Sequence, residues 1–509
     1  MKSKDMNSEL KKQIDWSTTF IPLLGVLGLC ILFIVLPEQS KLTLSIIRGF
    51  LGDDFGLYYA LLGVGFLVLS LYFAFSKFGK IQIGDCSKPE HSNFSWGTMI
   101  FTSTMAADIL FYSLCEWALY ANEPHLASMG SVQDWASTYP LFHWGPIAWS
   151  VYIVLAVAFG FMMHVRKRDR QRFSEACRPL LGDSVDGAVG KIIDIVAIFA
   201  LIAGTATTFS LATPLLSGAI CRVCGFADSI GLTISILLFI AVVYTLTVWF
   251  GMKGIARLAK LCIYLFFALL AYFLLLGGEA RYILETGFSA IGNLLQNFIG
   301  LATTTDPLRE TSFPQNWTIY YWAYWMVWCI ATPFFIALIS KGRTIKQIVV
   351  GGYGWGIAGT FTSFIILGNY GLAQQLKYGV ETSNFIANGG AYSEAILNVI
   401  GTLPLPEIAM ILLAITMVLF YATSFDSITM VASSYSYKNI SPDAEPDKRI
   451  RTLWAIMFIL LPIGLIFSEN SMYNLQSVSI IAAFPVGLIV CVILYSFIKD
   501  ANNYLNNRD

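Results

Sequence analysis

The chain has 509 residues, of which 56% are hydrophobic and 13% are charged, and its formal net charge is zero. Soluble globular domains contain roughly 45 to 50% apolar and about 25% charged residues, so this composition excludes an ordinary soluble protein and indicates a polytopic membrane protein. The balanced charge also argues against a nucleic-acid partner.

Twelve apolar runs have the length that crosses a bilayer, about 17 to 25 residues with few charges. They are centred near residues 28, 66, 108, 153, 203, 240, 268, 328, 359, 420, 460 and 488. The sequence therefore predicts an all-α polytopic membrane protein with twelve transmembrane helices. We expect an N-terminal arm over residues 1–18, one transmembrane domain over 19–498 and a short tail over 499–509. The first run is expected to remain as a helix, because no small-residue cleavage site follows it.

Lysine and arginine are distributed unevenly between the two sides of these spans. Basic residues beside a span resist translocation, so the side that is rich in them is predicted to be cytoplasmic. This places both termini in the cytoplasm, together with the segment RKRDRQR after the fourth span. Only six of the 32 basic residues lie on the other side: Lys41, Arg48, Arg222, Arg281, Arg309 and Lys377.

An aspartate, Asp108, lies within the third span, in the sequence FTSTMAADILFYSLCEW. An ionisable residue at this depth is usually functional. The small residues around it allow local unwinding or the close approach of a ligand. Three roles remain open: Asp108 shuttles a proton, pairs with a cationic substrate that lacks its own carboxylate, or caps an unwound segment by accepting hydrogen bonds from backbone amides.

Aromatic residues gather on the fourth and eighth spans. In FHWGPIAWSVY, the residues Trp144, Trp149 and Tyr152 fall within about 140° of arc at 100° per residue. In WTIYYWAYWMVW, a helical spacing predicts one aromatic stripe. Its members are Trp317, Tyr321, Tyr324, Trp325 and Trp328.

Two such aromatic surfaces facing each other would form a box. A quaternary ammonium ion donates no hydrogen bond, and cation–π contact, worth about 2 kcal/mol or more when desolvated, is how such ions are recognised. The pattern therefore favours a site for trimethylammonium-like head groups. The alternative is that each stripe is helix packing or an interfacial belt.

Hydroxyl groups cluster in the tenth span, in FYATSFDS. Thr423 and Ser424, with backbone carbonyls freed by a nearby helix break, are oxygen ligands suited to sodium. The competing interpretation is that both hydroxyls bond to their own helix. Asp426 lies near the cytoplasmic end of this span, where capping or gating is as reasonable as ion binding.

Several functional classes lack sequence support. The chain has no GxxxxGK[ST] segment for ATP, and it has no HExxH or GxSxG motif, so we expect no enzyme activity. Cys221 and Cys224 form a single CxxC, which is weak evidence for a metal. A transporter, a channel or a receptor remains.

The motifs FHWGPIAW, FPQNWTIYYWAYW, LISKGRT, GTATTFSLATPL, GMKGIARLAKL and SFIKDA resemble the betaine/carnitine/choline transporter family over nearly the whole chain. Within it, FHWGP, FPQNWT and SFIKDA look closest to the L-carnitine/γ-butyrobetaine exchangers. The resemblance implies two leading helices followed by two inverted five-helix repeats of the LeuT-like type, at about residues 97–280 and 317–498. It also implies a homotrimer that works by alternating access.

The resemblance also implies residue roles. Trp144, Trp149, Tyr152, Tyr324 and Trp325 match the family's aromatic box, and Trp322 and Trp328 match further aromatic positions that suit an entry site. Trp317 and Tyr321 would line the cytoplasmic side or a secondary site. The oxygen ligands of sodium-coupled members match a set that comprises Thr102, Met105, Phe420, Thr423 and Ser424.

Some positions depart from the family pattern. Asp108 stands where a glycine is typical, and an acid there resembles the proton-coupled choline carriers. In the exchangers an arginine side chain takes the place of the sodium ion, and the residue at the matching position here is Cys262. The exchangers also have a tyrosine three residues after the glutamate that matches Glu116. At that position this chain has Leu119, followed by Tyr120. Keeping Thr423 and Ser424 while lacking that arginine favours ion-coupled uptake over pure exchange.

We therefore expect a secondary transporter of carnitine, betaine, choline or related methylamines in the plasma membrane of a bacterium or archaeon. It would work by symport or by exchange, with sodium or a proton as the coupling ion and no other cofactor. An amino-acid or amine carrier with the same repeats is the alternative, and a channel or osmosensor is a third class. A channel would need a continuous water-filled pore lined by rings of charge.

Overall fold

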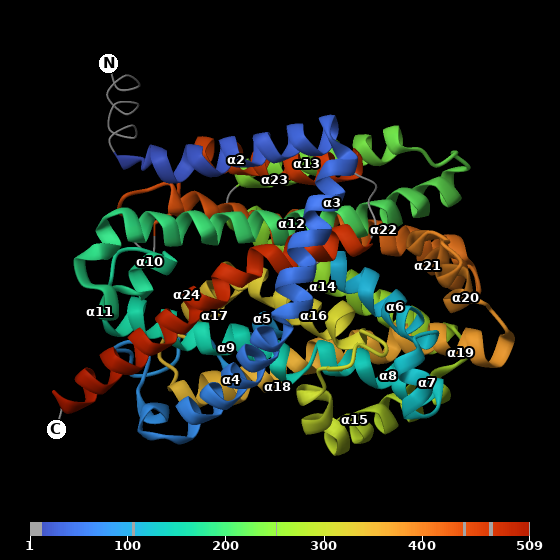
Figure 1. Ribbon diagram of the computed structural model, residues 1–509, viewed down its shortest axis with the longest axis horizontal. Helices are drawn as coiled ribbons and strands as arrows, with labels where there is room; N and C mark the ends of the chain where they lie inside the picture. Colours follow the sequence, from blue (N-terminus) through green and yellow to red (C-terminus); the bar gives the residue numbers. More distant parts are fainter. Residues whose placement is uncertain (1–12, 104–106, 251, 441–443, 468–471, 508–509) are drawn as a thin grey trace.

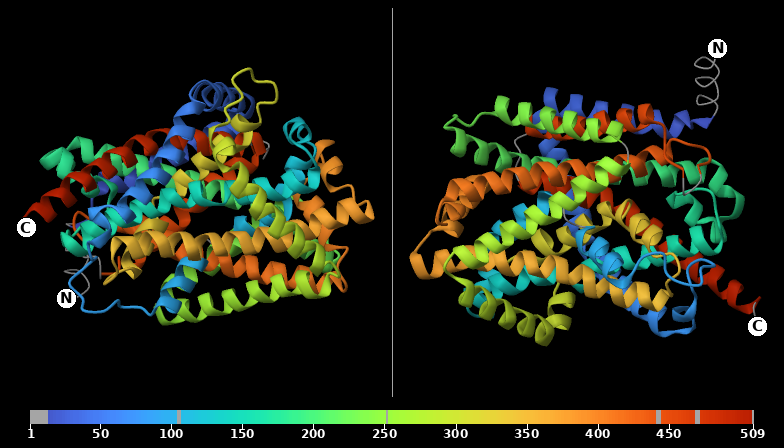
Figure 2. Two further views of the ribbon diagram at one scale, coloured as in Figure 1. Left: turned by 90° about the horizontal axis from the view of Figure 1, so that it is seen from below. Right: turned by 180° about the vertical axis from the view of Figure 1, so that it is seen from behind.

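The computed structural model describes residues 13–103, 107–250, 252–440, 444–467 and 472–507. Within these ranges the regular structure is helical, apart from isolated bridges between Ile14 and Tyr437 and between Gln82 and Thr344. The long helices run along the horizontal axis of Figure 1. The start of α2 and the end of α24 lie at one end of the bundle in every view (Figures 1 and 2), which we call the terminal end; the opposite end is the distal end.

Two long helices and their connection precede the central bundle. They are α2 (Trp16–Val35), α3 (Pro37–Arg48) and α4 (Gly56–Phe75). Leu24, Ile31 and Val35 on α2 are more than half exposed. Apolar side chains that face outward on a 20-residue helix fit a lipid environment.

The first half of the bundle contains a broken helix and then long, nearly continuous ones. Its elements are α5 (Asn93–Thr102), α6 (Ala107–Ala121), α7 (Pro124–Met129), α8 (Val132–His143), α9 (Pro146–Gly160), α10 (Phe173–Ala176), α11 (Arg178–Leu181), α12 (Ala188–Cys224), α13 (Ile230–Phe250), α14 (Met252–Ala271) and α15 (Ala280–Thr303). The stretch 132–165 is almost wholly buried and α12 largely so, which makes α8, α9 and α12 the centre of the molecule.

The second half begins with another broken helix. Its elements are α16 (Ile319–Trp328), α17 (Thr332–Ile339), α18 (Ile345–Ser363), α19 (Asn369–Tyr378), α20 (Thr382–Ala387), α21 (Tyr392–Ile400), α22 (Pro406–Tyr435), α23 (Lys448–Phe467) and α24 (Met472–Asn506). A π-helical turn, Pro314–Thr318, leads into α16. A capping box at Thr344 and Gln347 fixes the start of α18.

Seven helical stretches among the described residues are long and apolar enough to cross a membrane: Trp16–Val35, Gly56–Phe75, Val132–Val165, Ala188–Cys224, Ile345–Tyr378, Pro406–Tyr435 and Gln476–Asn506. Counting three bent pairs as single spans gives up to ten. The bends measure 66° between α5 and α6, 57° between α16 and α17, and 110° between α14 and α15. An all-helical chain with seven to ten candidate spans agrees with the polytopic prediction.

The two broken helices run in opposite directions. In Figure 1, α5 leads to α6 toward the distal end, whereas α16 leads to α17 toward the terminal end. Broken helices of this kind place freed backbone groups inside a membrane only where they border protein or a cavity. The breaks therefore mark the part of the molecule where a polar site is most expected.

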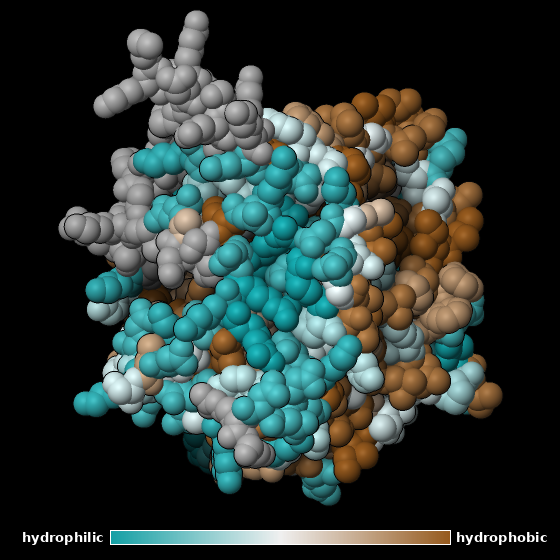
Figure 3. Space-filling view, turned by 90° about the vertical axis from the view of Figure 1, so that its left-hand side faces the viewer, coloured by the Kyte–Doolittle hydropathy of each residue, from teal (hydrophilic) through white to brown (hydrophobic). Residues whose placement is uncertain are grey.

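The terminal end of the molecule is polar, and the flank beside it is apolar (Figure 3). The basic segment after α9 lies at this end, where its arginines meet acids. Arg166 contacts Asp500 of α24 at 2.8 Å, and Arg172 contacts Asp194 of α12 at 3.1 Å. The positive charge that the sequence displays is thus partly neutralised in the folded chain.

Candidate functional site

The motif FHWGP forms the junction between α8 and α9. Trp144 is the last residue of α8's capping turn, and Pro146 occupies the first turn of α9, where its missing N–H costs nothing. A Cβ atom at Gly145 would lie 2.4 Å from the Leu141 carbonyl oxygen, so only glycine fits. The Thr360 hydroxyl of α18 donates to the Trp144 carbonyl at 2.8 Å and holds the junction in place.

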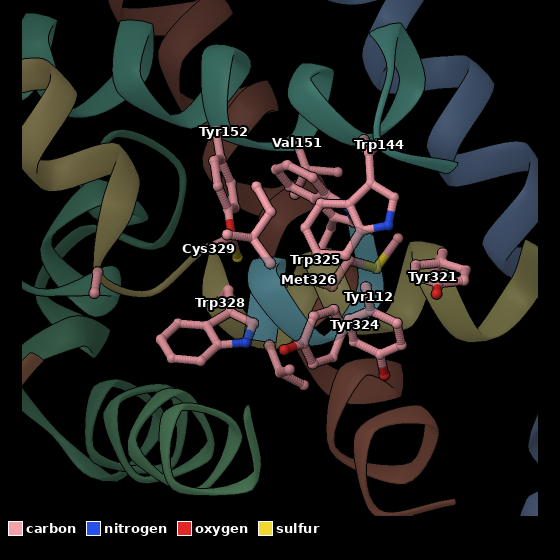
Figure 4. Close-up of a cluster of buried hydrophobic side chains, with 14 of the residues drawn as sticks. Tyr112, Trp144, Val151, Tyr152, Tyr321, Tyr324, Trp325, Met326, Trp328 and Cys329 are labelled. Carbon is pink, nitrogen blue, oxygen red and sulfur yellow. The ribbon is translucent and has the colours of Figure 1, made fainter. Parts of the chain in front are cut away.

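Four aromatic rings meet at Trp325 of α16. The ring centroids of Tyr152, Trp144 and Trp149 lie 4.7, 5.5 and 5.7 Å from the Trp325 ring. All four side chains are buried. Figure 4 shows Tyr152 and Trp144 on either side of Trp325. We call these four residues the aromatic cluster; the structure brings together the rings that the sequence spacing predicted to face each other.

Tyrosines extend this cluster on the side of α6. The Tyr112 ring lies 5.7 Å from Trp144 and 6.1 Å from Tyr324. Tyr324 and Tyr321 lie 6.5 and 5.9 Å from Trp144. These contacts are visible in Figure 4. Tyr112 was not singled out from the sequence, although it stands four residues after Asp108 and therefore on the same helical face.

Two indole N–H groups of the aromatic cluster are buried without a hydrogen-bond partner, those of Trp149 and Trp325. The indole nitrogen of Trp328, at the end of α16, is also buried without a hydrogen-bond partner. Most buried polar groups in proteins are satisfied, and exceptions need an explanation. Donors without an acceptor, grouped around aromatic faces, suit a ligand that brings its own oxygen atoms.

Asp108 lies directly beside this cluster, at the start of α6, and is 5% exposed. Its carboxylate accepts one hydrogen bond from the Tyr324 hydroxyl, one from Thr208 of α12 at 3.3 Å, and one from the Ile109 amide at 3.1 Å. The backbone contact agrees with a capping role, while the two hydroxyl donors connect Asp108 to α16 and α12. The remaining roles of Asp108 depend on transport behaviour.

Trp322, Trp328 and Trp317 lie apart from the aromatic cluster. Trp322 packs edge-on against Phe142 and His143, 5.4 and 6.1 Å away. Trp328 lies on the α12 side, where a Cβ atom at Gly204 would meet its nitrogen at 3.3 Å.

Trp317, expected to line the cytoplasmic side or a secondary site, lies at the distal end of the molecule. Its nitrogen donates to Glu123 at 2.9 Å, just before α7, at the distal end. Trp317 lies in the π-helical turn that leads into α16, and the chain enters that helix from the distal end.

A buried polar chain next to the cluster was missed by the sequence interpretation. The Glu116 carboxylate accepts from Trp144 Nε1 and from the Tyr120 hydroxyl, each at 2.8 Å. His143 bridges Tyr120 at 2.9 Å and Thr318 at 3.0 Å. The available signal was an ionisable side chain in an apolar run, the same signal that identified Asp108 eight residues earlier.

The predicted sodium ligands that the structure describes lie on α5 and α22, two helices that pack against α14. Phe266 contacts Phe420 of α22 at 5.7 Å, and Phe267 contacts Phe101 of α5 at 5.6 Å. Thr102 and Thr423 donate to carbonyls of their own helices, each at 2.9 Å. Because each hydroxyl uses only its hydrogen in this bond, the oxygen lone pairs of Thr102 and Thr423 can still accept a hydrogen bond or coordinate a cation.

Other members of this set differ in how they are placed. Ser424 is half-buried on α22. Met105 lies outside the described residues. Cys262 of α14 is buried and within hydrogen-bonding reach of Thr423, beside the predicted ion site. Asp426 pairs with the buried Arg451 of α23, which supports a structural or gating role for this aspartate over ion binding.

The chain matches the model of the betaine/carnitine/choline family transporters over residues 17–506. A relative from Desulfitobacterium hafniense (strain Y51), described as "Probable glycine betaine transporter", is 32% identical over 478 residues, covering 92% of this chain and 93% of the relative.

Of two further relatives, one is also named for glycine betaine and the other for carnitine. The glycine betaine transporter OpuD of Bacillus subtilis (strain 168) is 28% identical, with 95% and 94% of the two chains covered. A carnitine transporter of Acinetobacter baumannii is 26% identical, with 85% and 79% covered. The chain thus belongs to the betaine/carnitine/choline transporter family, and it is a multi-pass membrane transporter of compounds of this type, not an enzyme.

Proposed function

We propose that this chain is a secondary transporter that binds the quaternary ammonium group of its substrate in the aromatic cluster and moves it by alternating access. One observation carries the proposal: Trp144, Trp149 and Tyr152 surround Trp325, with ring centroids 4.7 to 5.7 Å from it, next to the breaks of two helices that run in opposite directions. Several ring faces around one point are what a trimethylammonium ion requires.

The partnerless indole nitrogens support a substrate that also carries an oxygen acceptor. Carnitine and betaine bring a carboxylate, and choline brings a hydroxyl group. Asp108 instead favours a substrate without a carboxylate. Its own carboxylate repels the carboxylate of carnitine or betaine and attracts a cation such as choline. These two features are expected to set the preference between carboxylated substrates and choline.

Coupling is proposed to use sodium or a proton, in symport or in exchange. Thr102, Met105, Phe420, Thr423 and Ser424 are the candidate sodium ligands by family resemblance, and the packing of α5 and α22 on α14 supports them. Asp108 is the candidate proton carrier because it is a buried carboxylate that accepts a hydrogen bond from Tyr324, the residue before Trp325 of the cluster.

The proposed membrane arrangement has twelve spans: the ten candidates, in which each bent pair counts as one span, together with α13 and α23. The inverted repeats, about residues 97–280 and 317–498, would each begin with a broken helix, α5 and α6 in the first and α16 and α17 in the second. The polar terminal end, with its arginine-rich segment, supports cytoplasmic termini in the plasma membrane of a bacterium or archaeon.

A homotrimer is proposed as the assembly. The helix α15 turns by 110° from α14 and lies at the edge of the bundle, where it carries an outward apolar stripe. The stripe comprises Leu284, Phe288, Leu295 and Ile299, each more than half exposed. A second copy that packs on α15 would cover it, and the mass of the purified protein in detergent measures the number of copies.

Transport by the purified protein tests the proposed function. Labelled carnitine, choline and glycine betaine are offered to proteoliposomes, with sodium and pH gradients imposed separately and with internal substrate present or absent. Accumulation of one of the three under one gradient supports symport, and dependence on internal substrate supports exchange. Equal uptake of all three without saturation would contradict a carrier and favour a channel.

A further inference from the structure

The indole of Trp144 is the one ring of the aromatic cluster whose nitrogen is bonded to a carboxylate. Trp144 Nε1 donates to Glu116 Oε2 at 2.8 Å, whereas the nitrogens of Trp149 and Trp325 have no partner. Figure 4 shows the Trp144 nitrogen on the side of the ring that faces away from Tyr152. The hydrogen bond therefore leaves the contacts between Trp144 and the other rings of the cluster undisturbed.

Glu116 is the end of a short chain of hydrogen bonds. His143 is bonded to Thr318 through Nε2 at 3.0 Å and to Tyr120 through Nδ1 at 2.9 Å. The Tyr120 hydrogen then goes to Glu116 Oε1, and the Trp144 hydrogen goes to Oε2. Both carboxyl oxygens of Glu116 thus accept a hydrogen bond from a neighbouring side chain.

Glu116 and His143 are both fully buried, and a carboxylate in such surroundings acts over a longer range than one at the surface. A hydrogen bond to an ionised acceptor is stronger than one between neutral groups, and it polarises the donor. Polarisation of the Trp144 N–H moves electron density into the indole ring. A more negative ring face binds a cation more tightly but has no such effect on a neutral molecule of the same shape.

We propose that Glu116 is a positioning and specificity-determining residue that acts through Trp144: its carboxylate orients the indole and strengthens the attraction of that ring for a cation. The proposal rests on the proposed function of the aromatic cluster. It predicts that Glu116 contributes to the preference for a cation over its neutral carbon analogue, and not to the shape of the site alone.

Binding of matched ligand pairs tests this. The pairs are choline with 3,3-dimethylbutan-1-ol and glycine betaine with 3,3-dimethylbutanoate, in which carbon replaces the quaternary nitrogen. Affinities are measured by calorimetry on the purified full-length protein. Glu116→Gln should lower the preference for the quaternary ammonium member of each pair about three- to tenfold and leave the affinity for 3,3-dimethylbutan-1-ol, the uncharged analogue, nearly unchanged. An equal loss for both members of a pair would overturn the proposal.

The chain offers a matched control in Glu123, whose carboxylate accepts from Trp317 at 2.9 Å in the same manner but outside the cluster. Glu123→Gln should leave the cation preference unchanged. In a Trp144→Phe background, Glu116→Gln should have little further effect, because the two side chains act as one unit. Full additivity of the two changes would contradict the proposal.

Two outcomes separate this inference from the proposed function. A wild-type protein without cation preference in either pair would remove both ideas, whereas a wild-type preference that Glu116→Gln preserves would remove only the role of Glu116. If Glu116→Gln does not fold, Trp144→Phe and Trp149→Phe give an independent comparison. The first should lose more cation preference than the second, and equal losses would overturn the proposal.

Discussion

The Tyr324 hydroxyl donates its hydrogen to the Asp108 carboxylate, and this contact joins the two broken helices of the molecule. Asp108 stands at the start of α6, and Tyr324 lies one residue before the ring around which the aromatic cluster forms. A change in the charge of Asp108 is therefore transmitted directly to α16.

Replacing Asp108 by Asn keeps the shape and the hydrogen bonding but removes the charge and the titration. If Asp108 carries the coupling proton, the variant binds substrate but loses accumulation driven by a pH gradient. If it pairs with a cationic head, choline affinity falls while carnitine binding is spared. Proteoliposome uptake and binding assays distinguish the two, and wild-type behaviour in both would leave only the capping role.

Replacing Trp325 tests the aromatic cluster. Leucine keeps an apolar side chain but removes the ring quadrupole, so substrate affinity should fall by about one to two powers of ten, from the loss of about 2 kcal/mol. Phenylalanine should cause a smaller loss. Small and equal effects of the two replacements on the measured dissociation constant would mean that Trp325 serves only in packing.

Gly356 of α18 controls the position of Trp149. A Cβ atom at this glycine would come within 2.6 Å of the Trp149 ring, so Gly356→Ala must displace the indole. We expect a loss of substrate affinity of about tenfold or more, with the rest of the fold retained. Gly354→Ala is the matched control on the same helix, because a Cβ atom there meets nothing within 4 Å. Similar affinities for both variants would disconnect Trp149 from binding.

Removing the hydroxyls of Thr423 and Ser424 tests sodium coupling. Changing both to alanine takes two oxygens from a site of roughly five or six ligands and should raise the sodium concentration required for uptake several-fold. The Thr423 hydroxyl also bonds to its own helix at 2.9 Å, so a loss of thermal stability must be measured in parallel. If uptake by the unmodified protein ignores sodium, the predicted ion site is wrong without any variant.

The aromatic cluster illustrates how far the sequence can lead. The arc calculated for Trp144, Trp149 and Tyr152 assumed one continuous helix, yet Trp144 ends α8 and Gly145 separates it from α9. The three rings still meet Trp325, because the turn at Gly145 carries Trp144 toward α16. The π-helical turn that contains Trp317 likewise cannot be read from residue spacing alone.

The partners of charged side chains could not be predicted from the sequence. Partners of buried charges come from distant segments: Glu116 meets Trp144 and, through Tyr120 and His143, is linked to Thr318 of the turn before α16. Likewise, the loop arginines predicted the polar end, but their pairing with Asp194 and Asp500 depends on how α12 and α24 fold back. Local patterns give the elements, and packing decides their partners.

The distance of 4.7 Å between the rings of Tyr152 and Trp325 has a thermodynamic consequence. A methylammonium group cannot lie between rings in contact, so this conformation must open before the cation is enclosed. The measured dissociation constant then equals the intrinsic one divided by the fraction of molecules with separated rings. Variants that favour separation would bind more tightly at equilibrium, and yet they could turn over more slowly if release requires the rings to close again.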